Sequence, residues 1–238
     1  MALLRLDKYL SDLGIASRRE VKELLRSGRV TVDGAMALRP EQKLDPALAC
    51  VELDGRPLIY TRYHYYMMNK PEGVITATED RSQRTVLDLL PPELRKLGLF
   101  PVGRLDKDTA GLLILTDDGD FSHRVAAPKS GIRKRYLAEV DGVPDETDAA
   151  AFREGLVLGD GTRCLPAELE CSGGSSCYVT VQEGKYHQVK RMLAARGKPV
   201  RRLCRLSVGG LELDKTLEPG AVRALTEEEL CTVFIGRK

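Results

Sequence analysis

The chain has 238 residues, of which 42% are hydrophobic and 30% are charged, so it can bury one large core or two unequal ones. Lys and Arg number 37 against 35 Asp and Glu, and the formal charge of +2 does not by itself indicate a nucleic-acid partner. No apolar run approaches the roughly 20 residues that a bilayer span needs, and charges interrupt the first ten residues, where a signal peptide would be apolar. We therefore expect a cytoplasmic protein that does not contact membranes.

The six cysteines form no C-x-x-C pair, and only three histidines could complete a metal site: His64, His123 and His187. Tetrahedral zinc sites depend on closely spaced Cys and His ligands. We therefore expect no metal ion and, in the cytoplasm, reduced thiols. His187 stands at the start of a helical pattern and is expected to be a hydrogen-bonded structural residue.

The first thirty residues carry the start and stop signals of two short helices. Leucines recur at i, i+4 and i+7 from Leu6, and Gly14 then ends the first helix. Ser17 and Glu20 form an S-x-x-E capping box that begins the second helix, and Gly28 ends it. A strand and a turn follow in the segment G-R-V-T-V-D-G.

The second predicted helix presents a cationic face. Arg18, Lys22 and Arg26 are spaced at i, i+4 and i+8, and Arg19 lies beside them. By itself this pattern is also typical of a solvated face, since neighbouring glutamates can pair with some of the charges. Over residues 1–60, however, the order of helix, Ser-Arg pair, helix and G-x-V-x-V-x-G turn resembles an RNA-binding module, here called S-four-like. It occurs in a small-subunit ribosomal protein, tyrosyl-tRNA synthetases and RNA-modifying enzymes, and it implies that the four cations contact phosphates.

A boundary is expected near Arg62, which divides the chain into an S-four-like domain over residues 1–62 and a larger domain over residues 63–238. In the larger domain, strand-like runs are interspersed with helical patterns at about 145–155 and 186–196. The expected strands cover residues 111–116, 136–140, 178–182 and 201–213. This order predicts an α+β fold whose larger domain is built on a mixed, largely antiparallel sheet.

A polar loop from Gly103 to Gly111 holds the densest cluster of reactive side chains. Asp106 and Asp108 have the spacing of the two aspartates in the D-x-D-x-T pattern of phosphatases, in which the first aspartate attacks phosphorus. That pattern normally follows a buried strand directly, whereas Gly-Arg-Leu precedes Asp106 here, and no acidic cluster for Mg²⁺ lies nearby. The same residues also fit a polar surface turn. The loop alone leaves these alternatives open.

Four sequence blocks, taken in order, connect this loop with the rest of the larger domain. They are N-K-P-E-G-V at 69–74, G-R-L-D-K-D-T-A-G-L-L-I-L-T-D-D-G at 103–119, K-R-Y-L at 134–137 and E-G-K-Y-H-Q-V-K-R-M at 183–192. With the N-terminal module they resemble, over essentially the whole chain, the pseudouridine synthases of the branch that modifies ribosomal RNA. This resemblance implies the isomerisation of a uridine to pseudouridine, a reaction that requires no cofactor.

The resemblance also implies roles for individual side chains. Asp106 matches the catalytic aspartate, which acts as nucleophile or base at the sugar. Tyr136 matches the tyrosine that stacks on the uracil, and Lys190 matches the basic residue that keeps the aspartate ionised. Relatives often have Arg at the last position, so Lys190 keeps the charge but changes the hydrogen-bond geometry. Asn69 and Lys70 are expected to support the catalytic loop rather than to touch the reacting atoms.

Further cations of the larger domain are expected to contact RNA. Arg104 is a candidate to fill the stack that a flipped uridine leaves, and a surface ion pair with Asp108 is the ordinary alternative. Two basic runs accompany the expected site. The first contains Arg124, Lys129, Arg133, Lys134 and Arg135, and the second, residues 185–205, includes Lys185 and Arg191 and has no acidic residue. From these runs Arg135, Lys185 and Arg191 are the candidates for phosphate contact.

The block that begins at Tyr186 resembles the enzymes of the small ribosomal subunit more than those of the large one. This resemblance implies that the partner is 16S rRNA and that the target is uridine 516. We expect the protein to act as a monomer on a small-subunit assembly intermediate. Three alternatives remain. They are a pseudouridine synthase acting on 23S rRNA, a non-catalytic RNA-binding assembly protein, and a hydrolase with Asp106 and Asp108 as paired carboxylates. The assembly protein would not need a carboxylate among phosphate-binding cations, and the hydrolase leaves Tyr136 unexplained.

Overall fold

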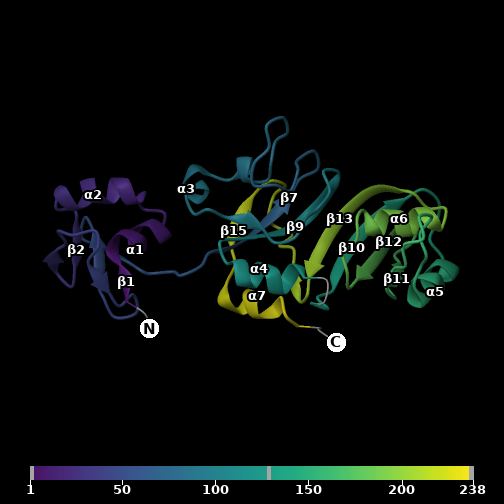
Figure 1. The fold of residues 1–238 in the computed structure, drawn as a ribbon. Helices are drawn as coiled ribbons and strands as arrows, with labels where there is room; N and C mark the ends of the chain where they lie inside the picture. Colours follow the sequence, from purple (N-terminus) through teal and green to yellow (C-terminus); the bar gives the residue numbers. More distant parts are fainter. Residues whose placement is uncertain (1–2, 128–129, 236–238) are drawn as a thin grey trace. The chain divides into compact units, whose positions relative to one another are not determined.

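The computed structural model describes residues 3–127 and 130–235 (Figure 1). Lys129 of the first basic run lies outside these ranges. Helices and strands are interspersed along the chain, and the larger sheet is mixed and mostly antiparallel, which confirms the predicted α+β class. Among the helices in the described ranges, none combines the length and the apolar character that crossing a bilayer requires.

The first of two compact units covers residues 1–64 and 91–99. Its elements are β1 (Leu4–Arg5), α1 (Leu6–Asp12), α2 (Arg18–Arg26), β2 (Val30–Val32), β3 (Ala35–Met36), β4 (Lys43–Leu44), β5 (Val51–Leu53), β6 (Arg56–Leu58) and α3 (Pro92–Arg95). The predicted capping box is present, because the Ser17 hydroxyl accepts from the Glu20 N–H and the Glu20 carboxylate accepts from the Ser17 N–H. Leu10, Val21 and Val30 belong to a buried core, which leaves the cationic face of α2 in solvent.

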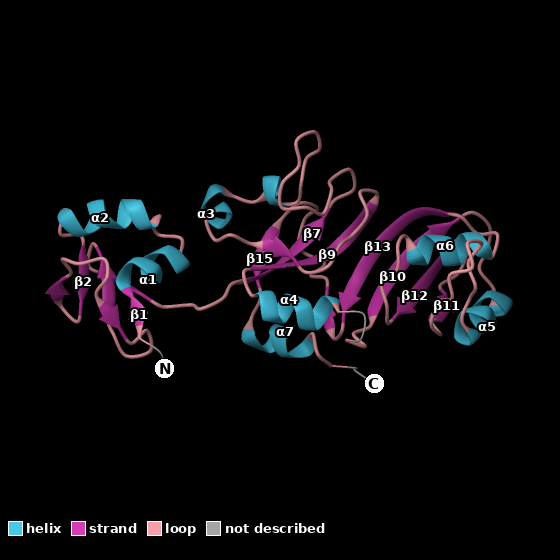
Figure 2. Ribbon diagram, in the orientation of Figure 1, coloured by secondary structure: helices cyan, strands magenta, loops and turns pink. Residues whose placement is uncertain are grey.

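The second compact unit covers residues 65–90 and 100–238. Its elements are β7 (Tyr65–Lys70), the 3₁₀ helix η1 (Leu87–Leu89), β8 (Phe100–Pro101), β9 (Thr109–Thr116), α4 (Gly119–Ala126), β10 (Lys134–Val140), α5 (Glu146–Glu154), β11 (Glu168–Cys171), β12 (Ser176–Val181), α6 (Gln188–Ala195), β13 (Val200–Val208), β14 (Leu211–Glu212), β15 (Val222–Ala224) and α7 (Glu227–Thr232). Figure 2 shows α5 and α6 beside the part of the sheet that contains β10, β11 and β12, and α4 and α7 beside the other part.

The sheet of this unit runs in the order β11-β12-β10-β13-β9-β7-β15, and all neighbouring strands are antiparallel except β9 with β13. In the parallel pair, Leu203 lies opposite Thr109 and Arg205 lies opposite Gly111. On the other side of β13, Arg205 lies opposite Tyr136 of β10, next to a β-bulge. The loop that precedes β9 is therefore placed beside β13 and β10.

Gly111 is required by the close approach of β9 and β13. Its φ is +104°, and a Cβ at this position would lie 2.3 Å from the carbonyl oxygen of Arg205. We expect Gly111→Ala to lower the free energy of unfolding by about 3 kcal/mol or more, because backbone strain and overpacking add. Urea denaturation of the variant and the parent measures this difference.

The matched control is Gly119→Ala at the start of α4. A Cβ there meets no atom within 4 Å, and its backbone φ is not positive. Alanine favours a helix over glycine, so this variant should be as stable as the parent or slightly more so. Equal stability of the parent and Gly111→Ala would contradict the close contact between the two strands.

Candidate active site

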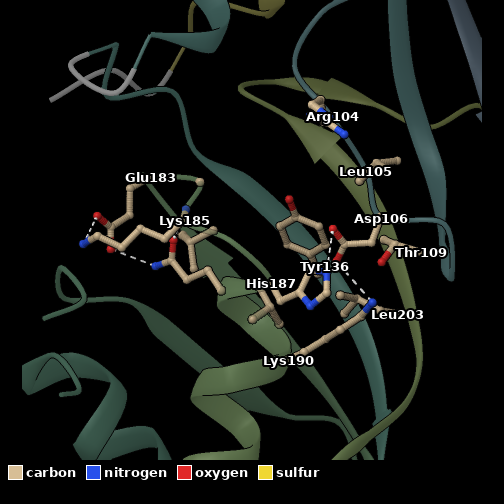
Figure 3. Close-up of a pocket in the computed structure, with 14 residues that line it drawn as sticks. Arg104, Leu105, Asp106, Thr109, Tyr136, Glu183, Lys185, His187, Lys190 and Leu203 are labelled. Atoms are coloured by element: carbon tan, nitrogen blue, oxygen red, sulfur yellow. Dashed lines mark hydrogen bonds and ion pairs between the residues drawn. The ribbon is translucent and has the colours of Figure 1, made fainter. Parts of the chain in front are cut away.

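Asp106, Tyr136 and Lys190 come from separate segments of the second unit and line one pocket (Figure 3). Asp106 lies in the loop before β9, Tyr136 lies on β10, and Lys190 lies on α6. The pocket has a volume of about 90 Å³. In Figure 3 the Asp106 carboxylate points toward the Tyr136 ring and the Lys190 amine, with His187 beside it. The fold thus brings together the three side chains that the sequence hypothesis placed in one site.

The loop that carries Asp106 is held by the amine of Lys70, at the end of β7. Lys70 has no exposed surface, and its Nζ donates hydrogen bonds to the carbonyl oxygens of Asp106 and Thr109 at 3.0 and 2.8 Å. Burial lowers the pKa of Lys70 to about 8, so the amine still carries its charge at neutral pH. The Thr76 hydroxyl donates to the Leu105 carbonyl in the same loop at 2.7 Å. Lys70 therefore supports the loop and does not reach into the pocket.

Lys190 is shared between the two carboxylates of the loop. Its Nζ lies 3.1 Å from Oδ2 of Asp106 and 2.5 Å from Oδ1 of Asp108. The hydrogen bond from Lys190 lowers the pKa of the Asp108 carboxyl below its usual range. Asp108 is 75% exposed, whereas the Asp106 side chain is 31% exposed. The ion-pair partner of Asp108 is therefore Lys190. The surface ion pair between Arg104 and Asp108, which the sequence offered as an alternative role for Arg104, is not formed.

His187 lies against the pocket. Helix α6 begins at Gln188, two residues later than expected, because His187 adopts the left-handed conformation with φ of +48°. That conformation is uncommon for residues other than glycine. The His187 ring stacks on Tyr186 with centroids 3.8 Å apart, and its Nε2 lies 3.5 Å from Oδ1 of Asp106. This contact was not predictable from the sequence, because helical periodicity does not indicate a left-handed residue.

The segment before α6 is fixed by the buried carboxylate of Glu183. It accepts hydrogen bonds from the Leu165 backbone N–H at 2.9 Å, the Gln188 amide at 2.8 Å and the Lys185 amine at 2.6 Å. Lys185 also donates to the carbonyl oxygen of Arg163. Its charge is therefore neutralised within the protein.

Other cations that the sequence predicted to bind RNA are also paired. Arg135 forms an ion pair with Glu170, and Arg191 forms one with Asp160. Further cations of the second basic run pair in the same way: Arg196 and Lys198 with Asp148, and Arg201 with Asp141. The carboxylates come from distant segments, so a stretch without acidic residues in the sequence is not a stretch of free charge in the structure.

Two sets of predicted RNA contacts have no such partner within the described residues. Arg104 is exposed and lines the pocket, and its side chain makes no hydrogen bond or ion pair there. The exposed cations of α2 are equally unpaired: Arg18, Arg19, Lys22 and Arg26. An unpaired cation can meet a phosphate without first losing a carboxylate, so these positions suit an anionic polymer best.

The pocket also contains a free hydroxyl. Among buried side-chain oxygen and nitrogen atoms of the described ranges, Oγ1 of Thr109 is the one without a hydrogen-bond partner. Tyr136 is 9% exposed, and its ring lies beside Asp106 (Figure 3). No group of three or more His, Cys, Asp or Glu in the described part of the chain is placed to hold a metal ion. Chemically, the pocket offers a carboxylate and an aromatic ring to a flat polar substrate.

Residues 64–195 match the family described as RNA pseudouridylate synthase, and residues 4–48 match the S4 domain. YtzG of Bacillus subtilis, named an uncharacterized RNA pseudouridine synthase, is 44% identical over 95% of this chain and 97% of its own length. The ribosomal small subunit pseudouridine synthases A of Vibrio cholerae and Escherichia coli are 43% and 39% identical, over 97% of this chain and 100% of theirs. A crystal structure of a pseudouridylate synthase is similar with a TM-score of 0.68 and 34% identity, over 97% of this chain and 99% of its own.

The shared ion pair predicts how Asp108 titrates. Lys190→Met should raise the pKa of the Asp108 carboxyl toward its ordinary value, because the hydrogen bond that lowers it is lost. Carboxyl ¹³C chemical shifts, followed by NMR from acid to neutral pH, measure the change. Lys185→Met is the matched control, since Lys185 pairs with Glu183. If Asp108 titrated identically in the parent and in Lys190→Met, the contact between them would be refuted.

Proposed function

The chain belongs to the RNA pseudouridylate synthase family, and from that premise we propose that it converts uridine 516 of 16S rRNA to pseudouridine. Two relatives named for the small ribosomal subunit, 43% and 39% identical over their whole length, support this target. The proposed domains are an RNA-binding S4 domain over residues 1–62 and a catalytic domain over residues 63–238. The enzyme acts as a cytoplasmic monomer on a small-subunit assembly intermediate.

We propose that the catalytic residues are Asp106, Tyr136 and Lys190. The observation that supports this proposal is that all three line one pocket. A protein that only binds RNA gains nothing from a carboxylate here, because a phosphate would be repelled by it. The pocket gives the carboxylate a cation and sets an aromatic ring beside it. These are the parts that a reaction at the glycosidic bond of uridine requires.

The reaction conserves every atom of the uridine. The bond between N1 of the uracil and C1′ of the ribose breaks, and a bond between C5 and C1′ forms, while C5 loses a proton and N1 gains one. Asp106 acts at the sugar as nucleophile or base, and the Lys190 amine lies 3.1 Å from its carboxylate. Tyr136 provides a face on which the detached uracil stacks while it turns.

A uridine reaches this pocket only after it has left its RNA stack. Arg104 lines the pocket and has no ion-pair or hydrogen-bond partner among the described residues, which supports the proposal that its guanidinium fills the vacated position. Arg135, Lys185 and Arg191 would first have to exchange a carboxylate for a phosphate. We therefore assign these three a smaller share of RNA affinity than the unpaired cations of α2.

Asp106→Asn should abolish pseudouridine formation while the affinity for RNA changes by no more than about threefold, because shape is kept and only the reacting charge is lost. Single-turnover rates on a 16S transcript and the dissociation constant for the same RNA measure the two effects. Asp108→Asn is the matched control. It should slow the reaction by less than about tenfold, or 1.4 kcal/mol of barrier, because the exposed Asp108 faces solvent.

The other functions give different outcomes. Equal loss of activity in the two variants would favour the hydrolase with paired carboxylates. RNA binding by the parent without pseudouridine formation would favour the assembly protein. Pseudouridine mapping of total rRNA from cells that lack the gene tests the target, since loss of a pseudouridine from 23S rRNA alone would overturn the choice of 16S rRNA.

The cationic face of α2 should determine much of the salt dependence. Replacing Arg18, Arg19, Lys22 and Arg26 together by Gln should weaken RNA binding and reduce the slope of log affinity against log salt by about 3, because each lost phosphate contact retains a counterion. Titrations of one RNA at several salt concentrations measure this slope. The control replaces the three arginines by Lys, which keeps the charge and should keep the slope. An unchanged slope in the Gln variant would remove α2 from the interface.

A further inference from the structure

A second cavity, with a volume of about 240 Å³, adjoins the candidate active site. Its walls come from residues 102–104, the C-terminal end of α4, and strands β10 and β13. Arg104, Tyr136, Glu183 and Gly184 line both this cavity and the catalytic pocket. The two spaces are therefore neighbours that share the Tyr136 side chain as part of their walls.

Two cations, Lys134 and Arg205, line the second cavity, and neither forms an ion pair within the described residues. Arg205 is 3% exposed, and the one hydrogen bond of its side chain there runs from Nε to the Leu112 carbonyl oxygen at 2.8 Å. The Lys134 amine donates to the Ile132 carbonyl oxygen at 3.2 Å. Carbonyl oxygens orient these groups, but they do not neutralise two charges.

Among the residues that the structure describes, the surrounding groups do not supply a counter-charge either. Burial, and after it the charge of Arg205, lowers the pKa of Lys134 to about 8. Arg104 adds a third cation to the walls. Glu183 is the carboxylate that lines the cavity, and its oxygens are engaged by Lys185 and by backbone and amide N–H groups. Buried cations are normally paired, so this arrangement is complete only with an anion between them.

We propose that the second cavity binds a phosphate group of the RNA chain next to the target uridine, with Lys134 and Arg205 as its ligands. The inference rests on the proposed function, because that function places the uridine in the adjoining pocket. A nucleotide held there has its own phosphates within one backbone unit of Tyr136. A neutral base in the second cavity would leave both cations uncompensated, whereas a phosphodiester carries the negative charge and the acceptor oxygens that they need.

The phosphate contact gives the reaction a second anchor. Binding the backbone beside the flipped nucleotide restricts the sugar as well as the base, and orientation of the sugar decides whether Asp106 reaches the glycosidic bond. The cavity is built by β10 and β13, which also carry Tyr136 and Leu203 of the pocket. Loss of the anchor should therefore slow the chemical step in addition to weakening RNA binding.

A double-mutant cycle between protein and RNA tests the contact. The RNA is a synthetic stem-loop that the parent enzyme modifies, and each phosphate flanking the target uridine is replaced in turn by a neutral methylphosphonate. At one position this replacement should slow single-turnover modification by the parent about tenfold or more, equivalent to about 1.4 kcal/mol. In Lys134→Met the same methylphosphonate should change the rate by less than about twofold. The phosphate charge that the methylphosphonate removes has no lysine partner in this variant.

Two control variants keep the result interpretable. Lys134→Arg keeps the cation and should respond to the methylphosphonate as the parent does. Lys215→Met removes a cation that is exposed and does not line the cavity. The effects of this substitution and of the methylphosphonate on the rate should therefore be additive. Thermal unfolding of each variant shows whether the fold is kept. A Lys134→Met protein that does not fold leaves the comparison to Lys134→Gln, which keeps a polar head without the charge.

The outcomes separate the inference from the function on which it rests. A parent enzyme that forms no pseudouridine in any rRNA would overturn the proposed function. If the parent is active but the effects of Lys134→Met and of the methylphosphonate are additive at every flanking phosphate, only the proposed phosphate contact is overturned. Inorganic phosphate, added at constant ionic strength, distinguishes the source of the anion. If it inhibits the parent but not Lys134→Met while all RNA cycles remain additive, the cavity binds free phosphate and the proposal is wrong.

Discussion

The candidate site depends on a buried ammonium group that gathers backbone carbonyls. Lys70 donates to the carbonyl oxygens of Pro71, Asp106 and Thr109, and so joins the end of β7 to the loop before β9. Burying an ammonium costs several kcal/mol unless hydrogen bonds replace its water, and here carbonyl oxygens do so. The loop is held by its main chain, which leaves the side chains of Asp106 and Asp108 free to meet Lys190. The Asn-Lys-Pro block thus acts on the site without entering it.

The distribution of paired and unpaired cations distinguishes binding surface from scaffold. Cations with carboxylate partners, such as Arg135, Lys185 and Arg191, form ion pairs within the protein itself. Exposed ion pairs of this kind contribute little to stability, but they reduce the field that an approaching phosphate meets. The cations of α2 and the two in the second cavity lack such partners among the described residues. We infer that RNA contacts concentrate where the protein has left its positive charges uncompensated.

Local features of the fold were predictable from the sequence, and long-range ones were not. The capping box of Ser17 and Glu20 and the short apolar run of β9 depend on neighbouring residues, so the sequence displays them directly. The pairing of Lys190 with Asp108, 82 residues away, depends on the strand order. Resemblance to a family identified Asp106, Tyr136 and Lys190 together, although periodicity alone left the loop ambiguous. Neither approach predicted the left-handed backbone of His187, because helical periodicity and family resemblance do not indicate the φ of a single residue.

Strand register explains why the site is found where it is. The parallel pairing of β9 with β13 sets Thr109 opposite Leu203, and the pairing of β13 with β10 sets Arg205 opposite Tyr136. A slip of one residue in either pair would turn the affected side chains to the other face of the sheet. The absence of a side chain at Gly111 permits the first pairing. The candidate pocket and the second cavity both use β10 and β13, so these two registers together position the aromatic ring, the loop aspartate and the buried cations.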